Sequence, residues 1–258
     1  MVWAFIRSTF LILPALLFVT AVATSIAVTM SYLSSRGRTH HKLARIWALW
    51  ILRLSGVRVE VQGQDNVPPG GNFVFAANHR SFYDIPAVLP YVNAQFRFLA
   101  KKSLFYWPFI GNYLRSAGHL PVHYDNARES LKTMSAAARK IQEHGISILL
   151  FPEAGRTLGQ MDPFKDGAAY IAIKAGVPIV PIGILGAGEI LPIHGRVIRP
   201  GPVTIRIGKP IPTIDLTLGD RTKLTQTLYQ RVCELCDIPS FPGTKQDNLA
   251  AVSGQVVR

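Results

Sequence analysis

The sequence predicts an α/β protein with a largely parallel central sheet flanked by helices, and with an N-terminal membrane helix. Three observations support this prediction. Short apolar, β-prone segments alternate with longer segments of helical periodicity, as in sheets built with crossover helices. The run 146–151 is continuously apolar, which is typical of a strand buried on both faces of a parallel sheet. Residues 8–35 carry no charge and are numerous enough for a helix to cross a hydrocarbon core of about 30 Å.

The composition indicates a membrane-associated protein with an anionic partner. Only 17% of the 258 residues are charged, whereas 48% are hydrophobic. The net charge of +13 suits anionic lipid, nucleic acid or a phosphorylated substrate. Nucleic acid is disfavoured because the basic residues are dispersed and no DNA- or RNA-binding motif occurs. Cys233 and Cys236 are too few for a disulfide framework and indicate ordinary thiols of a reducing compartment.

The apolar segment near the N-terminus is predicted to be a membrane anchor over residues 1–35. Residues 10–30 are almost wholly apolar, which favours a spanning helix. A cleaved signal peptide is an alternative, since Ala21-Val22-Ala23 resembles a cleavage site, but the apolar run continues to Met30 and favours an uncleaved anchor. A helical hairpin lying partly in one leaflet is also compatible with the sequence.

Flanking charges predict the orientation of this anchor. Arg7 precedes the apolar segment, whereas several basic residues follow it, namely Arg36, Arg38, Lys42 and Arg45. The positive-inside rule therefore places the rest of the chain on the cytoplasmic side, at the inner membrane if the source is bacterial. Residues 36–56 are expected to form a juxtamembrane amphipathic helix. Its Trp47 and Trp50 suit either the membrane interface or packing on the following domain.

One α/β domain is expected over residues 57–240, followed by a flexible tail over 241–258. Strands are predicted at 57–62, 73–77, 96–100, 118–122, 146–151, 177–183 and 203–207. Helices are predicted at 85–89, 125–145, 164–175 and 216–236. The helix at 125–145 has the clearest signals, with Asp125 or Asn126 as its cap and an apolar face of Leu131, Met134, Ala138 and Ile141.

A polar corner, residues 78–84, follows the strand predicted at 73–77. His79 would lie at the carboxyl end of that strand, and Asp84 would project from the first turns of a helix capped by Ser81. A carboxylate placed in this way can hold one imidazole nitrogen while the other takes a proton from a hydroxyl. His79 and Asp84 are therefore the predicted catalytic pair. On these residues alone, a buried histidine near a capping aspartate is an equally good interpretation.

A second polar corner, residues 151–157, follows the buried strand at 146–151. The carboxyl ends of parallel strands meet at one edge of a sheet, so both corners are expected to open to the same crevice. Arg156 offers a planar set of donors suited to a phosphate or carboxylate. Glu153 could accept a hydrogen bond from a substrate hydroxyl or pair with Arg156.

Three sequence blocks carry a resemblance to a known family. Asn-His-x4-Asp at 78–84, Phe-Pro-Glu-x-x-Arg at 151–156 and Val-Pro-Ile-Val-Pro at 177–181 resemble, in order and spacing, the lysophosphatidate acyltransferase (PlsC) family of glycerolipid acyltransferases. The resemblance covers residues 57–212. It implies transfer of a fatty acyl group from acyl-CoA or acyl-carrier protein to the sn-2 hydroxyl of lysophosphatidate, which makes phosphatidate at the membrane. It also implies no metal, no cofactor and no covalent enzyme intermediate.

The resemblance implies roles for individual residues. His79 would be the general base that deprotonates the acceptor hydroxyl, and Asp84 would orient it. Asn78, Arg80 and the backbone amides of the corner are the expected donors to the tetrahedral oxyanion. The expected substrate-binding residues are Glu153, Gly155, Arg156, Lys101, Lys165 and Arg80.

Two departures from the family bear on the acceptor. The third block often reads Glu-Gly-Thr-Arg, whereas this chain has Glu-Ala-Gly-Arg at 153–156. The second block usually ends in an acid and an arginine, where this chain has His123 and Tyr124. Since that arginine is a phosphate contact in the family, another lysolipid or an amino-lipid hydroxyl stays open as the acceptor. His119 and His123 lack a third ligand and do not predict a metal site.

Two alternatives outside acyl transfer were weighed on the same residues. A lipid thioesterase or hydrolase is disfavoured because the sequence has no Gly-x-Ser-x-Gly nucleophile elbow. A non-catalytic membrane-binding protein is disfavoured because both His79 and Asp84 are present.

Overall fold

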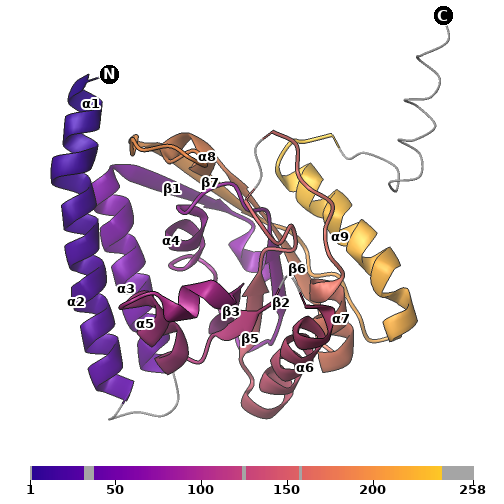
Figure 1. Ribbon diagram of the computed structural model, residues 1–258. Helices are drawn as coiled ribbons and strands as arrows, with labels where there is room; N and C mark the ends of the chain where they lie inside the picture. The colour runs from indigo at the N-terminus through magenta and orange to yellow at the C-terminus, as the bar shows by residue number, and fades with distance from the viewer. Residues whose placement is uncertain (1, 32–37, 124–125, 157–158, 240–258) are drawn as a thin grey trace, which may run out of the picture.

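The structure, a computed structural model of the chain, describes residues 2–31, 38–123, 126–156 and 159–239. Helices cover both faces of a central sheet, and a long helical hairpin lies along one side of the domain (Figure 1). This arrangement confirms the predicted fold class. The predicted tail at 241–258 lies outside the described residues.

The sheet of the described chain has seven strands in the order β1-β7-β6-β2-β5-β3-β4. Neighbouring strands are parallel except for β6 and β7, which pair antiparallel. Each predicted strand is present, with its ends shifted by one or two residues at most. The strands are β1 Val57–Gln62, β2 Val74–Ala77, β3 Phe96–Lys101, β4 Leu120–Val122, β5 Ser147–Leu150, β6 Ile179–Leu185 and β7 Gly201–Ile207.

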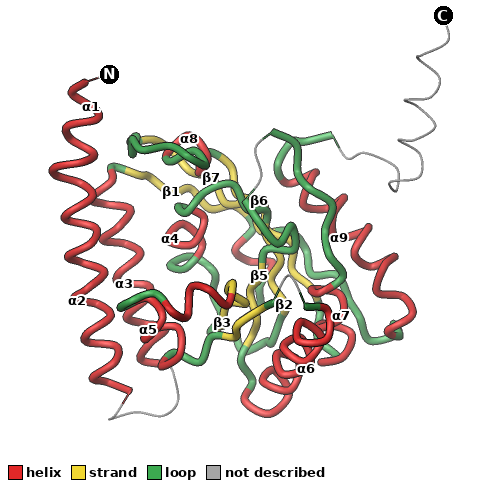
Figure 2. The backbone as a smooth tube through the Cα atoms, viewed as in Figure 1, coloured by secondary structure: helices red, strands yellow, loops and turns green. Residues whose placement is uncertain are grey.

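The helices lie in two layers around this sheet (Figure 2). The N-terminal hairpin comprises α1 Val2–Ile6, the π-helical turn η1 Arg7–Ile12, α2 Leu13–Ser31 and α3 Arg38–Ser55. The predicted helices of the domain correspond to α4 Asp84–Val88, α6 Ala127–His144, α7 Gly167–Ala175 and α9 Arg221–Leu235. Shorter elements that the sequence did not predict are η2 Gln64–Asn66, η3 Lys102–Tyr106, α5 Ile110–Ser116, α8 Ala187–Ile190 and η4 Leu218–Asp220.

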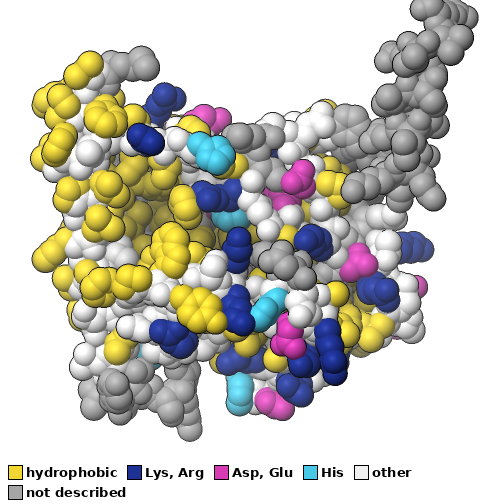
Figure 3. Space-filling view, in the orientation of Figure 1, with side chains coloured by type: hydrophobic (Ala, Val, Ile, Leu, Met, Phe, Trp, Pro, Cys, Tyr) yellow, Lys and Arg dark blue, Asp and Glu magenta, His cyan; other side chains and the backbone are white. Residues whose placement is uncertain are grey.

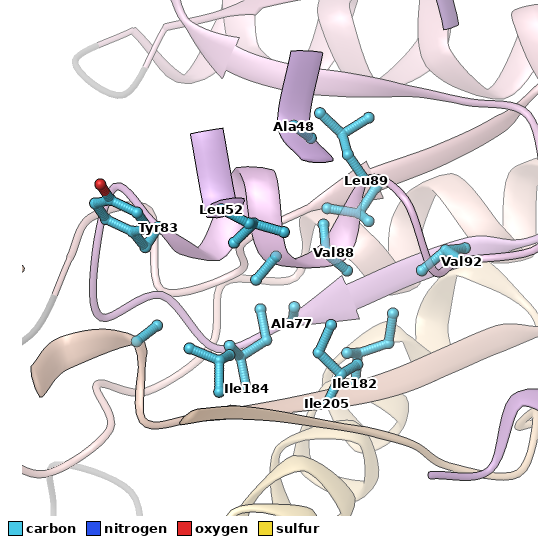
Figure 4. Close-up of a cluster of buried hydrophobic side chains, with 14 of the residues drawn as sticks. Ala48, Leu52, Ala77, Tyr83, Val88, Leu89, Val92, Ile182, Ile184 and Ile205 are labelled. Carbon is cyan, nitrogen blue, oxygen red and sulfur yellow. The ribbon is translucent and has the colours of Figure 1, made fainter. Parts of the chain in front are cut away.

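Two hydrophobic clusters hold the layers together, because successive strand residues point to opposite faces of a sheet. In β2, Phe75 and Ala77 join one cluster, whereas Val74 and Ala76 join the other. The first cluster lies under α3 and α4, and the second lies under α6, α7 and α9. Figure 4 shows part of the first cluster, with side chains of α3 and α4 against those of β2, β6 and β7, among them Ala48, Leu52, Ala77, Val88, Ile182, Ile184 and Ile205.

The ends of α6 follow the local sequence. The Asn126 side chain accepts a hydrogen bond from the Glu129 N–H at 3.1 Å, and Gly145 ends the helix with φ of 60°. The prediction of an apolar face was wrong at Leu131, which is 49% exposed. Leu131 belongs to the first turns of the helix, residues 126–132, none of which is buried.

The N-terminal helical segment packs against the rest of the chain over much of its length. Trp47 of α3 donates its indole N–H to the Thr20 hydroxyl at 3.0 Å. Near the other end, the Ser8 hydroxyl accepts the Ile198 N–H and donates to the Ile198 carbonyl, both at 3.1 Å. Within the described residues, Val2–Met30 is the helical segment long and apolar enough to cross a membrane.

Candidate active site

The first polar corner leaves the sheet at the carboxyl end of β2. Asn78 is buried, and its side-chain amide donates to the Ile184 carbonyl at 2.9 Å and accepts the Ile184 N–H at 2.7 Å. These two side-chain bonds join Asn78 to β6 beyond the last paired residues of the two strands, Ala77 and Ile182. Asn78 therefore fixes the end of β2 to β6, directly before His79, where the chain leaves the sheet.

His79 and Asp84 form a hydrogen-bonded pair. Nδ1 of His79 lies 2.7 Å from Oδ2 of Asp84, and the Asp84 side chain is completely buried. The same oxygen accepts the backbone N–H groups of Arg80 at 2.7 Å and Ser81 at 2.8 Å. Because the carboxylate accepts from Nδ1–H, the neutral imidazole presents an unprotonated Nε2. Nε2 is therefore the nitrogen that can take a proton from a substrate.

Ser81 does not cap the helix that follows the first corner. Ser81 lies before α4 but donates its hydroxyl to the Leu191 carbonyl at 2.8 Å and accepts the Tyr83 N–H at 3.2 Å. The helix itself begins at Asp84. The prediction of Ser81 as the cap of this helix was wrong, because the helix begins three residues after Ser81 and the Ser81 hydroxyl closes the turn before it instead.

Glu153 holds the corner from the second loop. Its side chain is 6% exposed, and its two oxygens accept the His79 N–H at 2.7 Å and the Asp162 N–H at 3.2 Å. Hydrogen bonds to an ionised carboxylate are stronger than neutral ones. The two hydrogen bonds of Glu153 therefore connect the first corner, at His79, with the loop that contains Asp162. Together with Asp84, Glu153 therefore engages the backbone N–H groups of His79, Arg80 and Ser81.

Phe151 stacks against the imidazole ring of His79. The imidazole of His79 stacks on the phenyl ring of Phe151, with centroids 4.1 Å apart and planes 16° apart. Phe98 of β3 also stacks with Phe151, with ring centroids 6.4 Å apart. The position of Phe151 directly after β5, the neighbour of β2, brings the two rings together.

Each polar corner carries an arginine. The guanidinium carbon of Arg156 lies 3.7 Å from the ring centroid of Phe82, which is 52% exposed. Arg80 donates from its guanidinium to the Gly159 carbonyl. Gly155 is exposed, and an added Cβ would meet nothing within 4 Å, so no crowding requires glycine there.

The other predicted binding residues lie further along the same edge. Lys101 ends β3 with an exposed side chain, and β5 separates β3 from β2. Lys165 also has an exposed side chain, and its backbone N–H donates to the Pro152 carbonyl at 3.0 Å. His123 follows β4 and is half-buried, whereas Tyr124 lies outside the described residues. Thus Asp84 and Glu153 bond to His79 directly, Arg80 and Arg156 lie on the same two corners, and the two exposed lysines lie outside these corners.

Sequence reasoning missed the support that surrounds the pair. It gave no role to Phe151 and Phe82, and it offered Asn78 as an oxyanion donor although its amide is engaged with β6. One signal for Phe151 was present in the sequence. It is an aromatic residue that comes directly after a buried strand and beside the second polar corner.

Cys233 lies in α9 and Cys236 follows it directly. Both are free and buried, and burial raises the pKa of Cys233 and raises the pKa of Cys236 to about 12. Thiols with raised pKa values are poor nucleophiles, as predicted for ordinary thiols. Among the described residues, no group of three or more His, Cys, Asp or Glu side chains is arranged to hold a metal ion.

Fold and site together define an α/β protein with a hydrogen-bonded histidine–aspartate pair at the carboxyl edge of a mostly parallel sheet. Comparison with protein families gives the class a name, since residues 58–185 match the family model described as Acyltransferase. The chain belongs to this acyltransferase family.

Similar proteins support the assignment. The chain is 33% identical over 179 residues to the chloroplastic 1-acyl-sn-glycerol-3-phosphate acyltransferase BAT2 of Brassica napus, covering 68% of this chain and 51% of the relative. It is 34% identical over 213 residues to the 1-acyl-sn-glycerol-3-phosphate acyltransferase CHLREDRAFT_174358 of Chlamydomonas reinhardtii, covering 81% of this chain and 61% of that protein. The chain thus matches between half and three-fifths of the length of these relatives.

A solved structure has the same fold. The 1-acyl-sn-glycerophosphate (LPA) acyltransferase PlsC of Thermotoga maritima superposes with a TM-score of 0.74, covering 89% of this chain and 94% of that one. At 24% sequence identity, this likeness establishes the fold and not the substrate.

Proposed function

We propose that the protein is a membrane-associated O-acyltransferase that moves a fatty acyl group from acyl-CoA or acyl-carrier protein to the sn-2 hydroxyl of lysophosphatidate, forming phosphatidate. The observation that carries the proposal is the 2.7 Å bond between His79 and the buried Asp84, inside the segment that matches the acyltransferase family. The names of the similar proteins support lysophosphatidate as the acceptor.

In the reaction, Nε2 of His79 accepts the proton of the acceptor hydroxyl while that oxygen attacks the thioester carbonyl. Asp84 keeps the ring oriented and stabilises the imidazolium that forms. Collapse of the tetrahedral intermediate expels the thiolate, which takes the same proton back from His79. The base is thus restored in each turnover, and no covalent enzyme intermediate is needed.

The oxyanion of this intermediate needs donors that are not already engaged. The backbone amides of His79, Arg80 and Ser81 are bonded to carboxylates, and the Asn78 amide is bonded to Ile184. Of the donors expected from the sequence, the Arg80 guanidinium has N–H groups beyond the one given to Gly159. We therefore assign the oxyanion contact to Arg80.

The acceptor phosphate is assigned to the basic residues at the carboxyl edge. Arg156 is held over Phe82 close to the catalytic corner, and a guanidinium can bind two phosphate oxygens at once. Lys165 and Lys101 add positive charge at the same edge. Glu153 acts indirectly, because it binds the backbone of His79 and fixes the loop that carries Arg156.

The N-terminal hairpin is assigned to the membrane. The segment Val2–Met30 is apolar enough to enter a bilayer, and its bonds at Ser8 and Thr20 keep it alongside the domain. A helix held in this way fits a hairpin embedded in one leaflet better than a helix that crosses the membrane and leaves the domain behind. The cytoplasmic side stays a prediction from the flanking charges.

An acceptor panel tests the proposal. Membranes containing the protein are supplied with radiolabelled acyl-CoA or acyl-carrier protein and with lysophosphatidate, other lysolipids or an amino-lipid, next to membranes containing His79→Ala. Acylated lysophosphatidate should form at least about 10²-fold faster than in the variant. Release of free fatty acid instead would indicate a thioesterase, and acylation of no lysophospholipid above the control would refute the proposed substrate class. If another acceptor alone is acylated, the departure from the family at the end of the second block, where this chain has His123, would account for the choice of acceptor.

A further inference from the structure

The segment between β3 and α5 presents exposed aromatic side chains. Tyr106, Trp107 and Phe109, called here the aromatic lip, are 73%, 52% and 52% exposed. Large apolar side chains gathered at the surface mark an interaction site rather than chance exposure. The acyl-transfer steps described above use none of them.

An unusual backbone holds the lip outward. The Ile110 N–H donates to the Pro108 carbonyl at 2.7 Å across Phe109, whose φ and ψ are 62° and −62°. This is the rare, strained form of the γ-turn, and a bulky residue adopts it only where the surroundings impose it. The exposure of Phe109 is therefore built into the fold.

Contacts beneath the lip keep it rigid. A Cβ on Gly111 would clash with the Phe105 carbonyl, so only glycine lets α5 approach η3 this closely. Arg115 donates to the same Phe105 carbonyl and, at 2.6 Å, to the Asn112 side chain. The lip is a fixed protrusion with a defined shape.

The surroundings of the lip carry positive charge and lack carboxylates. The sequence has no Asp or Glu between Asp84 and Asp125, and none before Glu60. Lys101 and Lys102, at the base of the lip, are both exposed. The electrostatic complement of this region is therefore an anionic surface.

The lip also continues the apolar face of the hairpin. Helix α5 packs against α2, so the lip lies next to the hairpin. Figure 3 shows hydrophobic side chains spreading from the hairpin toward the middle of this face, with Lys and Arg side chains along their border. The exposed hairpin residues include Phe10, Leu17, Phe18 and Trp50. An apolar area bordered by cations matches a bilayer, which is apolar inside and anionic at its surface.

We propose that the aromatic lip is a second membrane-inserting element, which enters the headgroup region of an anionic phospholipid bilayer beside the hairpin. Tyr106 and Trp107 suit that region because each joins an apolar ring to a polar group. Since β3 ends at the same sheet edge as β2, insertion of the lip brings the His79 edge to the lipid surface. The proposal rests on the membrane association proposed above and is independent of the acceptor.

Quenching of Trp107 fluorescence tests the insertion. Trp3, Trp47 and Trp50 are replaced by phenylalanine in the full chain, which is reconstituted in phosphatidylglycerol vesicles with brominated acyl chains. Bromine near the headgroup should quench Trp107 strongly, and bromine near the chain end should quench it less. A protein that keeps Trp50 alone serves as the hairpin control. Quenched Trp50 with unquenched Trp107 would overturn the proposal, and no catalysis is needed for this measurement.

A second experiment asks whether the lip matters on a membrane. In the double variant W107S/F109S, KM for lysophosphatidate in anionic vesicles should rise about tenfold or more, because less apolar area enters the bilayer. The rate with detergent-dispersed lysophosphatidate should stay within about twofold of the unmodified protein, since the lip does no chemistry. Ile214→Ser, at a position 85% exposed in the loop before α9, is the matched control and should change neither. Circular dichroism checks that each variant is folded.

Two results would overturn the proposal by pointing to another occupant. An equal loss in detergent and in vesicles would make the lip part of the substrate site itself. A change in Trp107 emission that follows protein concentration without lipid, and that disappears in F109S, would make the occupant a second copy of this chain.

Discussion

The imidazole of His79 lies flat on the phenyl ring of Phe151, with centroids 4.1 Å apart and planes 16° apart. The hydrogen bond from Nδ1 to Asp84 fixes the direction of the ring within its plane, at 2.7 Å. The stack fixes the plane itself. The imidazole of His79 is thus restrained about two axes, which is the kind of pre-organisation that the proposed proton transfer requires.

Phe151→Leu should therefore impair catalysis through the geometry of His79. Leucine fills much of the volume but cannot stack, so kcat should fall about tenfold with little change in KM. Steady-state kinetics with Phe164→Leu, a buried phenylalanine of the other cluster, provides the control. Equal kcat losses in the two variants would mean that loss of core packing, and not of the stack, is responsible.

Asp84→Asn should nearly abolish activity without unfolding the protein. The amide keeps the shape of the carboxylate, but it removes the charge that stabilises the imidazolium and selects the tautomer with a free Nε2. A fall in kcat of about 10²–10⁴-fold is expected, measured beside thermal unfolding. Asp162→Asn, an exposed neighbour of the second loop, is the control and should stay near the original rate. Substantial activity in Asp84→Asn would remove the carboxylate from the mechanism.

Glu153→Gln separates a structural role from a substrate contact. Glutamine has one acceptor oxygen, so its NH2 group would face the N–H of His79 or of Asp162. The expected loss is about 1–3 kcal/mol of unfolding free energy, with a lower kcat because His79 moves. Unchanged thermal stability with a raised KM for the acceptor would instead support the direct acceptor contact that the sequence predicted.

Stability should fall as the solution becomes acidic, because of three buried histidines, two on α3 and one between α5 and β4. His40, His41 and His119 are at most 9% exposed and lie near Arg97 and Lys140. Burial, with Arg97 adding to it, lowers the pKa of His41 to about 4 and holds the pKa of His119 well below its ordinary value. The unfolded chain binds these protons near pH 6.5. The contribution of these histidines to the free energy of unfolding is therefore fully present above that pH and is lost as the pH falls from about 6.5 to 4.

Thermal unfolding in mild detergent at a series of pH values checks this slope. His41→Phe should flatten it, since phenylalanine keeps the ring that packs edge-on against Phe96 and does not titrate. His144→Phe, at an exposed position on α6, should leave it unchanged. The same slope in all three proteins would exclude His41 as its source.

Much of the fold could be predicted because it depends on local periodicity. The alternation of apolar strands and amphipathic helices defined the α/β class, and Asn126 and Gly145 defined the ends of α6. The segment 102–116 could not be predicted in this way. Its η3, γ-turn and α5 depend on Gly111 meeting the Phe105 carbonyl, a contact without periodic signal.

The contact between His79 and Asp84 could be predicted for the same reason, since the two residues are close in sequence. The supports of the pair come from other strands. Phe151 stacks on His79 only because β5 neighbours β2, and Asn78 reaches Ile184 only because β6 is the other neighbour. Strand order is a property of the whole sheet, so local patterns do not contain it.

The bonds between Ser8 and Ile198 limit how this protein can be prepared. Removing the N-terminal helix is the usual first attempt at a water-soluble form of a membrane enzyme. Here it would remove from the backbone of Ile198 the two hydrogen bonds with Ser8 and the one from Arg7, and would uncover the side of α3 where Trp47 bonds to Thr20. We expect the shortened chain to aggregate on expression, and detergent or lipid nanodiscs with the complete chain to be the practical route to its enzymology.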